Sequence, residues 1–138
     1  MARVLGIDPG SRRCGIAVTD SQRTMAFPRP AMPVDDELFT TLKALIDEES
    51  VDLVVVGRPV ALSGNETAST EASDDFFRVL REKISPVKIV QWDERLTTYE
   101  AQKSLSGAGM KAKSHRSRVD SAAAVIMLQN YVDALSSD

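Results

Sequence analysis

The sequence predicts an α/β protein built on a mixed sheet that is flanked by helices. Two apolar segments near the N-terminus are joined by a short turn, which is typical of an antiparallel hairpin. Further along the chain, apolar strands alternate with amphipathic helices, which is typical of strands connected by helical crossovers. The 138 residues suffice for one core and are too few for two ordinary domains, so we expect a single domain over residues 1–138.

The first half of the chain contains three predicted strands and one predicted helix. Residues 3–8 and 13–19 are rich in Val, Ile, Leu and Ala, and the Pro-Gly pair between them suits a tight reversal. Residues 24–34 contain three prolines, which a central strand could not accommodate, so an edge strand or an extended stretch is expected there. Residues 36–49 are expected to form an amphipathic helix, because apolar side chains recur at helical spacing at Leu38, Leu42, Leu45 and Ile46.

The second half of the chain alternates strands and helices. The run LVVVG at 53–57 is typical of a strand buried on both faces, and residues 88–92 form the next predicted strand. Between these strands a helix is predicted over about 70–83, with a buried face made by Ala72, Phe76, Val79 and Leu80. Two further helices are predicted at 97–106 and at about 117–135.

The composition narrows the class of protein and its location. The net charge of -3 argues against a protein that coats nucleic acid by bulk electrostatics, although it leaves room for a local site. No apolar run approaches the roughly 20 residues that cross a bilayer, and the N-terminus lacks a secretory pattern. A cytoplasmic protein without a membrane partner is therefore expected. Its single cysteine, Cys14, lies in an apolar strand and is expected to be a small buried hydrophobe.

Acidic residues stand where predicted buried elements begin or end. Asp8 follows the first strand. Asp93 and Glu94 follow the last strand, and Asp120 precedes the apolar part of the last helix. Asp120 shares a helical stripe with apolar side chains, so its carboxylate is expected to point inward, where an ionised group needs a cation or hydrogen-bond donors. The other members of this stripe are Ala124, Met127, Leu128, Tyr131 and Leu135.

Each acid also has an ordinary structural interpretation. An aspartate before Pro-Gly, as at Asp8, is common turn chemistry. The acidic pair after the last strand could be solvated or could bind the neighbouring Arg95. Asp120 could be favoured by the helix dipole or could pair with Arg118. The functional hypothesis therefore depends on the three positions together.

Separate carboxylates on a strand, a second strand end and a helix are typical of a site for a pair of hard divalent cations. Such ions take oxygen ligands, so Mg²⁺ or Mn²⁺ is expected, with two ions as the predicted number. Two metals about 4 Å apart can activate a water and stabilise the leaving oxygen in phosphodiester cleavage. Zinc held by Cys and His is excluded by the single cysteine and single histidine. The pattern therefore predicts a metal-dependent nuclease.

Basic residues frame the proposed site along the chain. The stretch KAKSHRSR, residues 111–118, carries four basic residues and no acid and leads directly to Asp120. A basic run is usually a solvated loop, but this one is attached to a candidate catalytic helix, so we favour contacts with phosphates. The candidate nucleic-acid-binding residues are Arg12, Arg13, Arg58, Arg95, Lys111, Lys113, Arg116 and Arg118.

Four segments resemble the YqgF/RuvX-type family of Holliday-junction resolvases and pre-16S rRNA nucleases. They are GIDPGSRRCGIAVTD, VVVGRPVALSGNET, DERLTTYEAQ and RVDSAAAVIMLQNYV, and they occur in the same order nearly end to end. DERLTT is the most specific of them, whereas the loop RPVALSGNET is less polar than the family pattern. The resemblance implies an RNase H-like fold, a cytoplasmic bacterial protein and divalent-metal phosphodiester hydrolysis. It further implies that Asp8, Glu94 and Asp120 are the metal-binding and catalytic carboxylates, with Asp93 as the alternative to Glu94.

Several functions remain open from the sequence. The leading interpretation is an endonuclease acting on precursor ribosomal RNA in ribosome biogenesis.

 A resolvase acting on branched DNA is the alternative, and it would require a homodimer to cut two strands symmetrically, whereas the rRNA role allows a monomer. GIDPG before a hairpin also resembles the first phosphate loop of actin-like kinases, but those need a second domain for which this chain has no room. A non-catalytic nucleic-acid-binding module is the remaining class.

Overall fold

The computed structural model describes residues 2–59, 63–96 and 121–136, and within them it confirms the predicted α/β architecture. Five strands form one sheet in the order β3-β2-β1-β4-β5. Their bounds are Arg3–Asp8 for β1, Arg13–Thr19 for β2, Ala26–Pro33 for β3, Val51–Arg58 for β4 and Lys88–Asp93 for β5. The helices are α1 at Leu38–Glu48, α2 at Ala68–Ile84 and α5 at Ala122–Ser136, and a short 3₁₀ turn, η1, covers Glu94–Leu96.

The strand pairing follows the two patterns seen in the sequence. β1 and β2 form the predicted antiparallel hairpin, and β3 continues it on the outer side of β2. β4 pairs with β1 and with β5 in parallel, because each of these connections passes through a helix or through the hairpin. The carboxyl ends of β1, β4 and β5 therefore meet at the same edge of the sheet.

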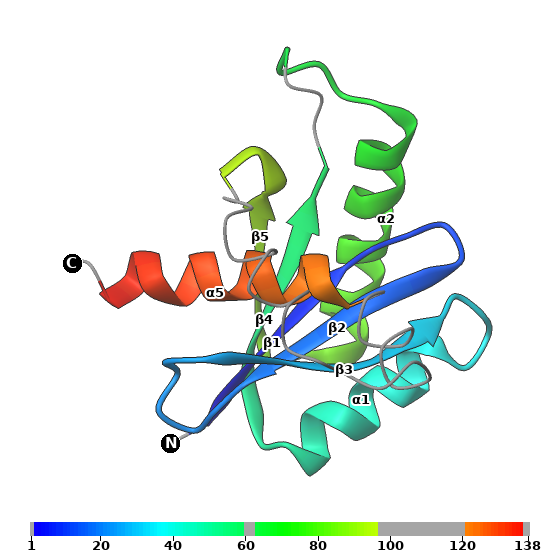
Figure 1. Cartoon of the computed structure of the whole chain (residues 1–138). Helices are drawn as coiled ribbons and strands as arrows, with labels where there is room; N and C mark the ends of the chain where they lie inside the picture. Colours follow the sequence, from blue (N-terminus) through cyan, green and yellow to red (C-terminus); the bar gives the residue numbers. More distant parts are fainter. Residues whose placement is uncertain (1, 60–62, 97–120, 137–138) are drawn as a thin grey trace, which may run out of the picture.

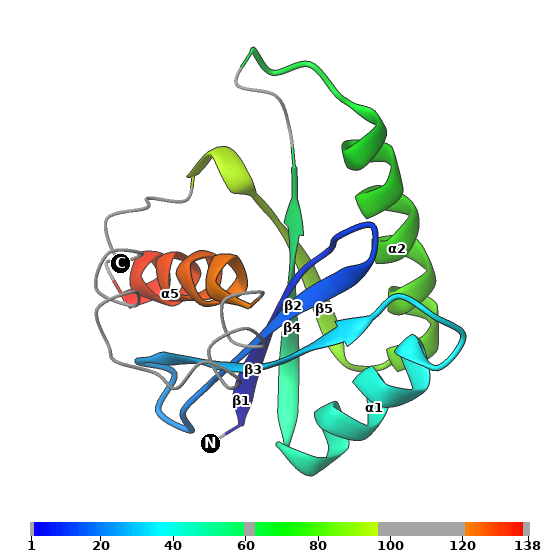
Figure 2. The ribbon, with the colours of Figure 1, turned by 45° about the vertical axis from the view of Figure 1, so that its right-hand side comes forward.

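Helices cover the two faces of the sheet unequally (Figures 1 and 2). α1 and α2 pack on one face, and of the three described helices α5 is the one that crosses the other face. Alternate residues of each central strand point to opposite faces, so Ile7 and Val56 contact the side of α1 and α2, whereas Val4 and Val55 contact the side of α5. Both faces are apolar, which explains why the central run of β4 lacks polar residues.

β3 occupies an edge of the sheet, as its three prolines require. Pro28, Pro30 and Pro33 have no backbone N–H to donate, whereas an inner strand needs donors along both of its sides. The predicted helix at 97–106 lies outside the described residues, as does the predicted start of the last helix at 117–120.

The buried face of α2 differs from the predicted one. Leu80 is buried as expected, but Ala72 is exposed and Phe76 and Val79 are only partly buried. The buried positions are Thr70, Ser73, Leu80 and Ile84. Two of these are hydroxyl residues whose side chains bond to backbone carbonyls of Gly57 and Pro59, so hydrogen bonding rather than apolar area seats this end of the helix. An apolar periodicity could not identify such a face.

Candidate active site

Asp8 and Glu94 come together at the shared carboxyl edge of the parallel strands. Asp8 ends β1, and Glu94 begins the 3₁₀ turn directly after β5. Along β1, Val4 and Gly6 face α5, so the alternation of side chains places Asp8 on the α5 side as well. The side chains of Asp8 and Glu94 are joined by a hydrogen bond. Two residues far apart in the sequence therefore form a carboxylate pair.

The electrostatics of this pair depend on a proton. Burial raises the pKa of Glu94 to about 9, and the hydrogen bond and negative charge of Asp8 act in the same direction. At neutral pH and without a cation nearby, Glu94 therefore keeps a proton that its hydrogen bond shares with Asp8. A carboxyl pair that holds a proton in this way is a place where a cation would be stabilised once the proton leaves.

Gly57, near the end of β4, makes room for Glu94. A Cβ atom at this position would lie 2.6 Å from Oε1 of Glu94 and 2.9 Å from Sδ of Met127, a residue of α5. Glu94 and Met127 consequently pack directly over the bare backbone of Gly57. Sequence reasoning noted this glycine only as the end of a strand; its position at the carboxyl end of a buried run was the available signal.

Asp93 forms an ion pair with Arg95 and is not part of the carboxylate pair of Asp8 and Glu94. The Arg95 guanidinium approaches the Asp93 carboxylate at 2.6 Å, and the Arg95 backbone N–H donates to the same carboxylate at 2.9 Å. These hydrogen bonds lower the pKa of Asp93. The structure thus brings Glu94 to Asp8 and gives Asp93 the ion pair that the sequence allowed for either acid.

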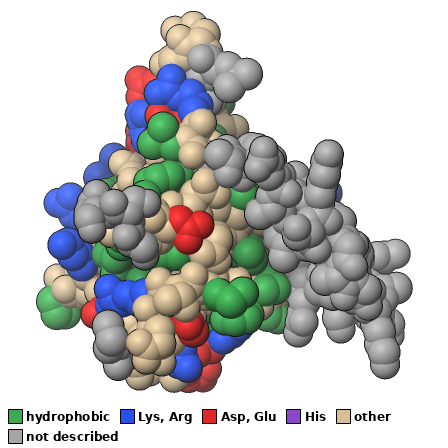
Figure 3. All heavy atoms as spheres, turned by 60° about the vertical axis from the view of Figure 1, so that its left-hand side comes forward, with side chains coloured by type: hydrophobic (Ala, Val, Ile, Leu, Met, Phe, Trp, Pro, Cys, Tyr) green, Lys and Arg blue, Asp and Glu red, His purple; other side chains and the backbone are tan. Residues whose placement is uncertain are grey.

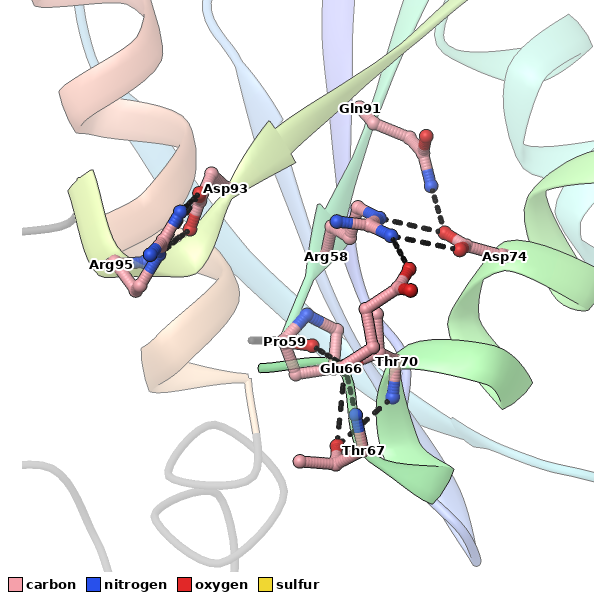
Figure 4. A network of polar contacts seen from close by, with 9 residues as sticks. All are labelled: Arg58, Pro59, Glu66, Thr67, Thr70, Asp74, Gln91, Asp93 and Arg95. Carbon is pink, nitrogen blue, oxygen red and sulfur yellow. Dashed lines mark hydrogen bonds and ion pairs between the residues drawn. The ribbon is translucent and has the colours of Figure 1, made fainter. Parts of the chain in front are cut away.

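Arg58 belongs to an ion-pair network that ties β4 to α2 (Figure 4). Its guanidinium donates to Asp74 at 2.9 Å and 3.1 Å and to Glu66 at 2.5 Å, and Gln91 of β5 donates to Asp74 as well. The same end of α2 is closed by a capping box between Thr67 and Thr70. Arg58 therefore has a structural role whatever else it contacts.

The other candidate basic residues divide into two groups. Arg12 and Arg13 stand in the turn and at the first residue of β2, and both are exposed, on the chain segment that follows Asp8. Lys111, Lys113, Arg116 and Arg118 lie outside the described residues. On the face drawn in Figure 3, basic side chains form small groups, several of them beside acidic side chains, rather than one continuous patch.

Asp120 also lies outside the described residues, but the helix that follows it is described. Ala124, Met127 and Leu128 of the predicted stripe are buried, and Tyr131 is partly buried against Trp92. Leu135 was expected to be buried with them and is 49% exposed, because α5 extends beyond the sheet at that end.

Cys14 is buried, as predicted, with 1% of its surface exposed. Burial raises the pKa of its thiol, so the reactive thiolate is disfavoured. The thiol lines a cavity of about 440 Å³ between the turn after Asp8 and α2, on the sheet face opposite Glu94. This cavity is separate from the carboxylate pair.

The donor set at the strand ends suits a hard divalent cation. Asp8 and Glu94 offer only carboxylate oxygens, the ligands that Mg²⁺ and Mn²⁺ prefer. Within residues 2–59, 63–96 and 121–136, no three Asp, Glu, His or Cys side chains converge to form a complete metal site. In the same part of the chain, no helix is long and apolar enough to cross a membrane.

The fold and the family of the chain follow from comparison with known proteins. RuvC from Thermus thermophilus, solved in complex with a Holliday junction substrate, superimposes with a TM-score of 0.61 at 12% identity and covers 99% of this chain and 98% of its own. A second Thermus thermophilus RuvC structure gives a TM-score of 0.56 at 16% identity. The chain therefore has the RNase H-like fold of these proteins.

The family model RuvX, described as a Holliday junction resolvase, matches residues 2–134. Relatives named as pre-16S rRNA nucleases include one from Geobacillus thermodenitrificans, 38% identical over 96% of this chain and 98% of the relative. Another, from Lactococcus lactis, is 37% identical over 96% of this chain and 95% of the relative. The chain belongs to the RuvX family and is a nuclease, a hydrolase of phosphodiester bonds.

Proposed function

We propose that this protein is a divalent-metal-dependent endonuclease that matures the 5′ end of pre-16S rRNA. The observation that carries this function is the carboxylate pair of Asp8 and Glu94 at the carboxyl edge of three parallel strands. Asp120 is the third proposed carboxylate, because in the chain it stands two residues before α5, the helix whose Met127 contacts Glu94. Mg²⁺ or Mn²⁺ is the proposed cofactor, with two ions.

Asp8, Glu94 and Asp120 would hold the ions. Bound divalent ions supply Lewis-acid chemistry, which lowers the pKa of a water and offsets charge on the leaving oxygen. Glu94 must release its proton before it can serve as a ligand, so its raised pKa links cation binding to pH. Gly57 and Met127 fix the side chain of Glu94 at the position where that exchange takes place.

The proposed RNA substrate is supported by the names of the relatives, which are similar to this chain over nearly its whole length. Ribosome biogenesis also fits a protein of the cytoplasm. Arg12 and Arg13 follow Asp8 closely in the chain and are proposed to contact phosphates together with Arg58, Arg95 and the basic residues of 111–118. Such contacts position a strand and read no bases.

Cleavage of Holliday junctions is the second candidate function. It is favoured by the description of the RuvX family and by the fold shared with RuvC. This activity requires two active sites that cut two strands, so a protein with this function is expected to be a homodimer. The rRNA activity places no such demand on the chain.

A cleavage panel tests both candidates. It contains a precursor rRNA end, single-stranded RNA, a four-way DNA junction and duplex DNA, each with Mg²⁺, Mn²⁺ or EDTA. Wild type is compared with Asp8→Asn and with Asp47→Asn, which removes an exposed acid of α1 near the amino end of β4, whereas the carboxylate pair lies at the carboxyl ends of the strands. We expect wild type and Asp47→Asn to cleave the rRNA end in a metal-dependent way. We expect Asp8→Asn to lose this cleavage.

Other outcomes select other functions. Preferential cleavage of the junction by a dimer would assign the resolvase activity. Binding without cleavage of any substrate by any of the three proteins, with Mg²⁺, with Mn²⁺ or with EDTA, would assign a binding module and leave Asp8 as a turn residue.

A further inference from the structure

Ser121 directly precedes α5 and is completely buried, although it is polar. Its backbone carbonyl accepts the hydrogen bond of the Val125 N–H at 3.0 Å, so Ser121 occupies the N-cap position of the helix. A serine at this position usually turns its hydroxyl back to cap the helix. Here the hydroxyl contacts the sheet instead.

The hydroxyl of Ser121 bridges two neighbouring strands. It accepts a hydrogen bond from the Ile16 N–H of β2 at 3.0 Å and donates to the Arg29 carbonyl of β3 at 2.7 Å. Ile16 and Arg29 face each other in the register of these strands, next to the irregularity between Cys14 and Ile16. The hydroxyl thus joins the start of the helix to a defined position in the ladder.

That position is next to the carboxylate site. Ile16 pairs with Ile7 of β1, and the next pair in the register contains Asp8. Further along the same helix, Met127 packs with Glu94 over Gly57. The start of α5 is therefore joined to the sheet beside Asp8, and a later turn of the same helix contacts Glu94.

We infer that Ser121 is a positioning residue for the carboxylate site. It fixes the start of α5 beside Asp8, and through the same helix it holds Met127 against Glu94. It touches neither substrate nor reacting atoms. This role rests on the proposed metal-dependent function, because what it positions is the proposed set of ligands.

The test compares two buried hydroxyls, each of which accepts a hydrogen bond from the backbone N–H of a strand. Ser121→Ala removes the hydroxyl beside the site. Thr19→Val removes the hydroxyl that accepts from the Val4 N–H at 2.9 Å, at the opposite end of β2. Unfolding temperature is measured first without metal, and Mg²⁺ affinity is then measured by calorimetry and by the rise in unfolding temperature with Mg²⁺ concentration. Wild type and Asp8→Asn are the references.

Both variants are expected to unfold at a lower temperature, because each leaves a buried N–H without its partner. Only Ser121→Ala is expected to lose Mg²⁺ affinity, by about 10-fold or more, as is typical when a residue that orients metal ligands is removed. Equal Mg²⁺ affinity in Ser121→Ala and wild type would overturn the inference. If Ser121→Ala does not fold, Ser121→Cys, which keeps a weaker polar group, is expected to show a smaller loss of affinity, and unchanged affinity there would likewise overturn it.

The same data separate this inference from the proposed function. If wild type binds Mg²⁺ no better than Asp8→Asn, the proposed metal site fails. If wild type binds Mg²⁺ and Ser121→Ala binds it equally well, the metal site stands and only the positioning role fails.

Discussion

Glu94 and Asp93 are neighbours in the chain, yet they have different partners. Asp93 ends β5 and pairs with Arg95, whereas Glu94 turns to Asp8. The preference for Glu94 as the partner of Asp8 could be reached from the family resemblance. The packing of Glu94 over Gly57 could not be predicted in this way. It depends on Met127, which is 70 residues from Gly57 in the chain and is brought there only by tertiary packing.

Replacing Asp8 by Asn is expected to leave the metal-free fold intact or slightly more stable, by up to about 1 kcal/mol. The reason is that the substitution removes one of two acidic groups held in contact. Urea unfolding of wild type and variant in EDTA measures the difference. Strong destabilisation of Asp8→Asn would instead identify Asp8 as a structural turn residue.

The stability of the metal-free protein is expected to fall as pH rises. The pKa of Glu94 is about 9 in the folded protein and lies near its ordinary value in the unfolded chain, so between these values the folded state binds more protons. Stability from this group is therefore present below about pH 4.5 and is lost as pH rises toward 9.

Glu94→Gln tests this pH dependence, because it removes the titrating group and keeps its shape. Unfolding free energy measured in EDTA at several pH values should decline with a slope of at most about 1.4 kcal/mol per pH unit in wild type. The variant should show a flatter profile. Identical slopes would show that Glu94 does not hold its proton in the folded protein.

Replacing Gly57 by Ala is expected to destabilise the protein by about 1–3 kcal/mol and to displace Glu94, because the added methyl overlaps both Glu94 and Met127. The displacement should reduce the pH dependence described for Glu94 and weaken Mg²⁺ binding. Thermal unfolding across pH, with and without Mg²⁺, measures both. A loss of stability with wild-type pH dependence and Mg²⁺ affinity would mean that Gly57 serves packing alone.

At the scale of elements, the order of strands and helices was predictable because periodicity and turn residues are local signals. The prolines placed β3 at an edge, and the apolar run placed β4 inside the sheet. The buried face of α2 was predicted only in part: Leu80 is buried as expected, but Thr70 and Ser73 are buried through hydrogen bonds to the end of β4 and the loop after it. Such contacts depend on partners distant in the sequence.

At Arg58, a structural role through ion pairs can be separated from a role in binding phosphate. Arg58→Gln removes its ion pairs with Glu66 and Asp74, which are partly exposed, so a stability loss below about 1 kcal/mol is expected. Asp74→Asn breaks the main pair and keeps the guanidinium. If Arg58 also contacts phosphate, as proposed, Arg58→Gln should weaken RNA binding and Asp74→Asn should not. Equal binding by both variants and wild type, measured by fluorescence anisotropy, would leave Arg58 with its structural role alone.

At the scale of the whole molecule, the charges explain how an acidic protein could bind nucleic acid. The net charge of -3 is unfavourable for binding at long range. Several described arginines are neutralised locally, as in the pairs Arg29–Glu49, Arg58–Asp74 and Arg95–Asp93. Productive binding should therefore depend on a small number of well-placed cations, with a moderate dependence on salt.

Neutralising Arg116 and Arg118 together as glutamines is expected to weaken binding to RNA of any sequence. Phosphate contacts carry no base information, so the loss should be uniform across sequences. If both residues contact phosphates, the slope of log affinity against log salt should fall by about 1.4 for single-stranded RNA, from about 0.7 for each contact. The matched control is Arg78→Gln with Arg81→Gln, which makes the same change in net charge on the exposed face of α2. Equal losses in both double variants would show that only the overall charge matters, whereas a loss confined to Arg116 and Arg118 would place the basic stretch in contact with the substrate.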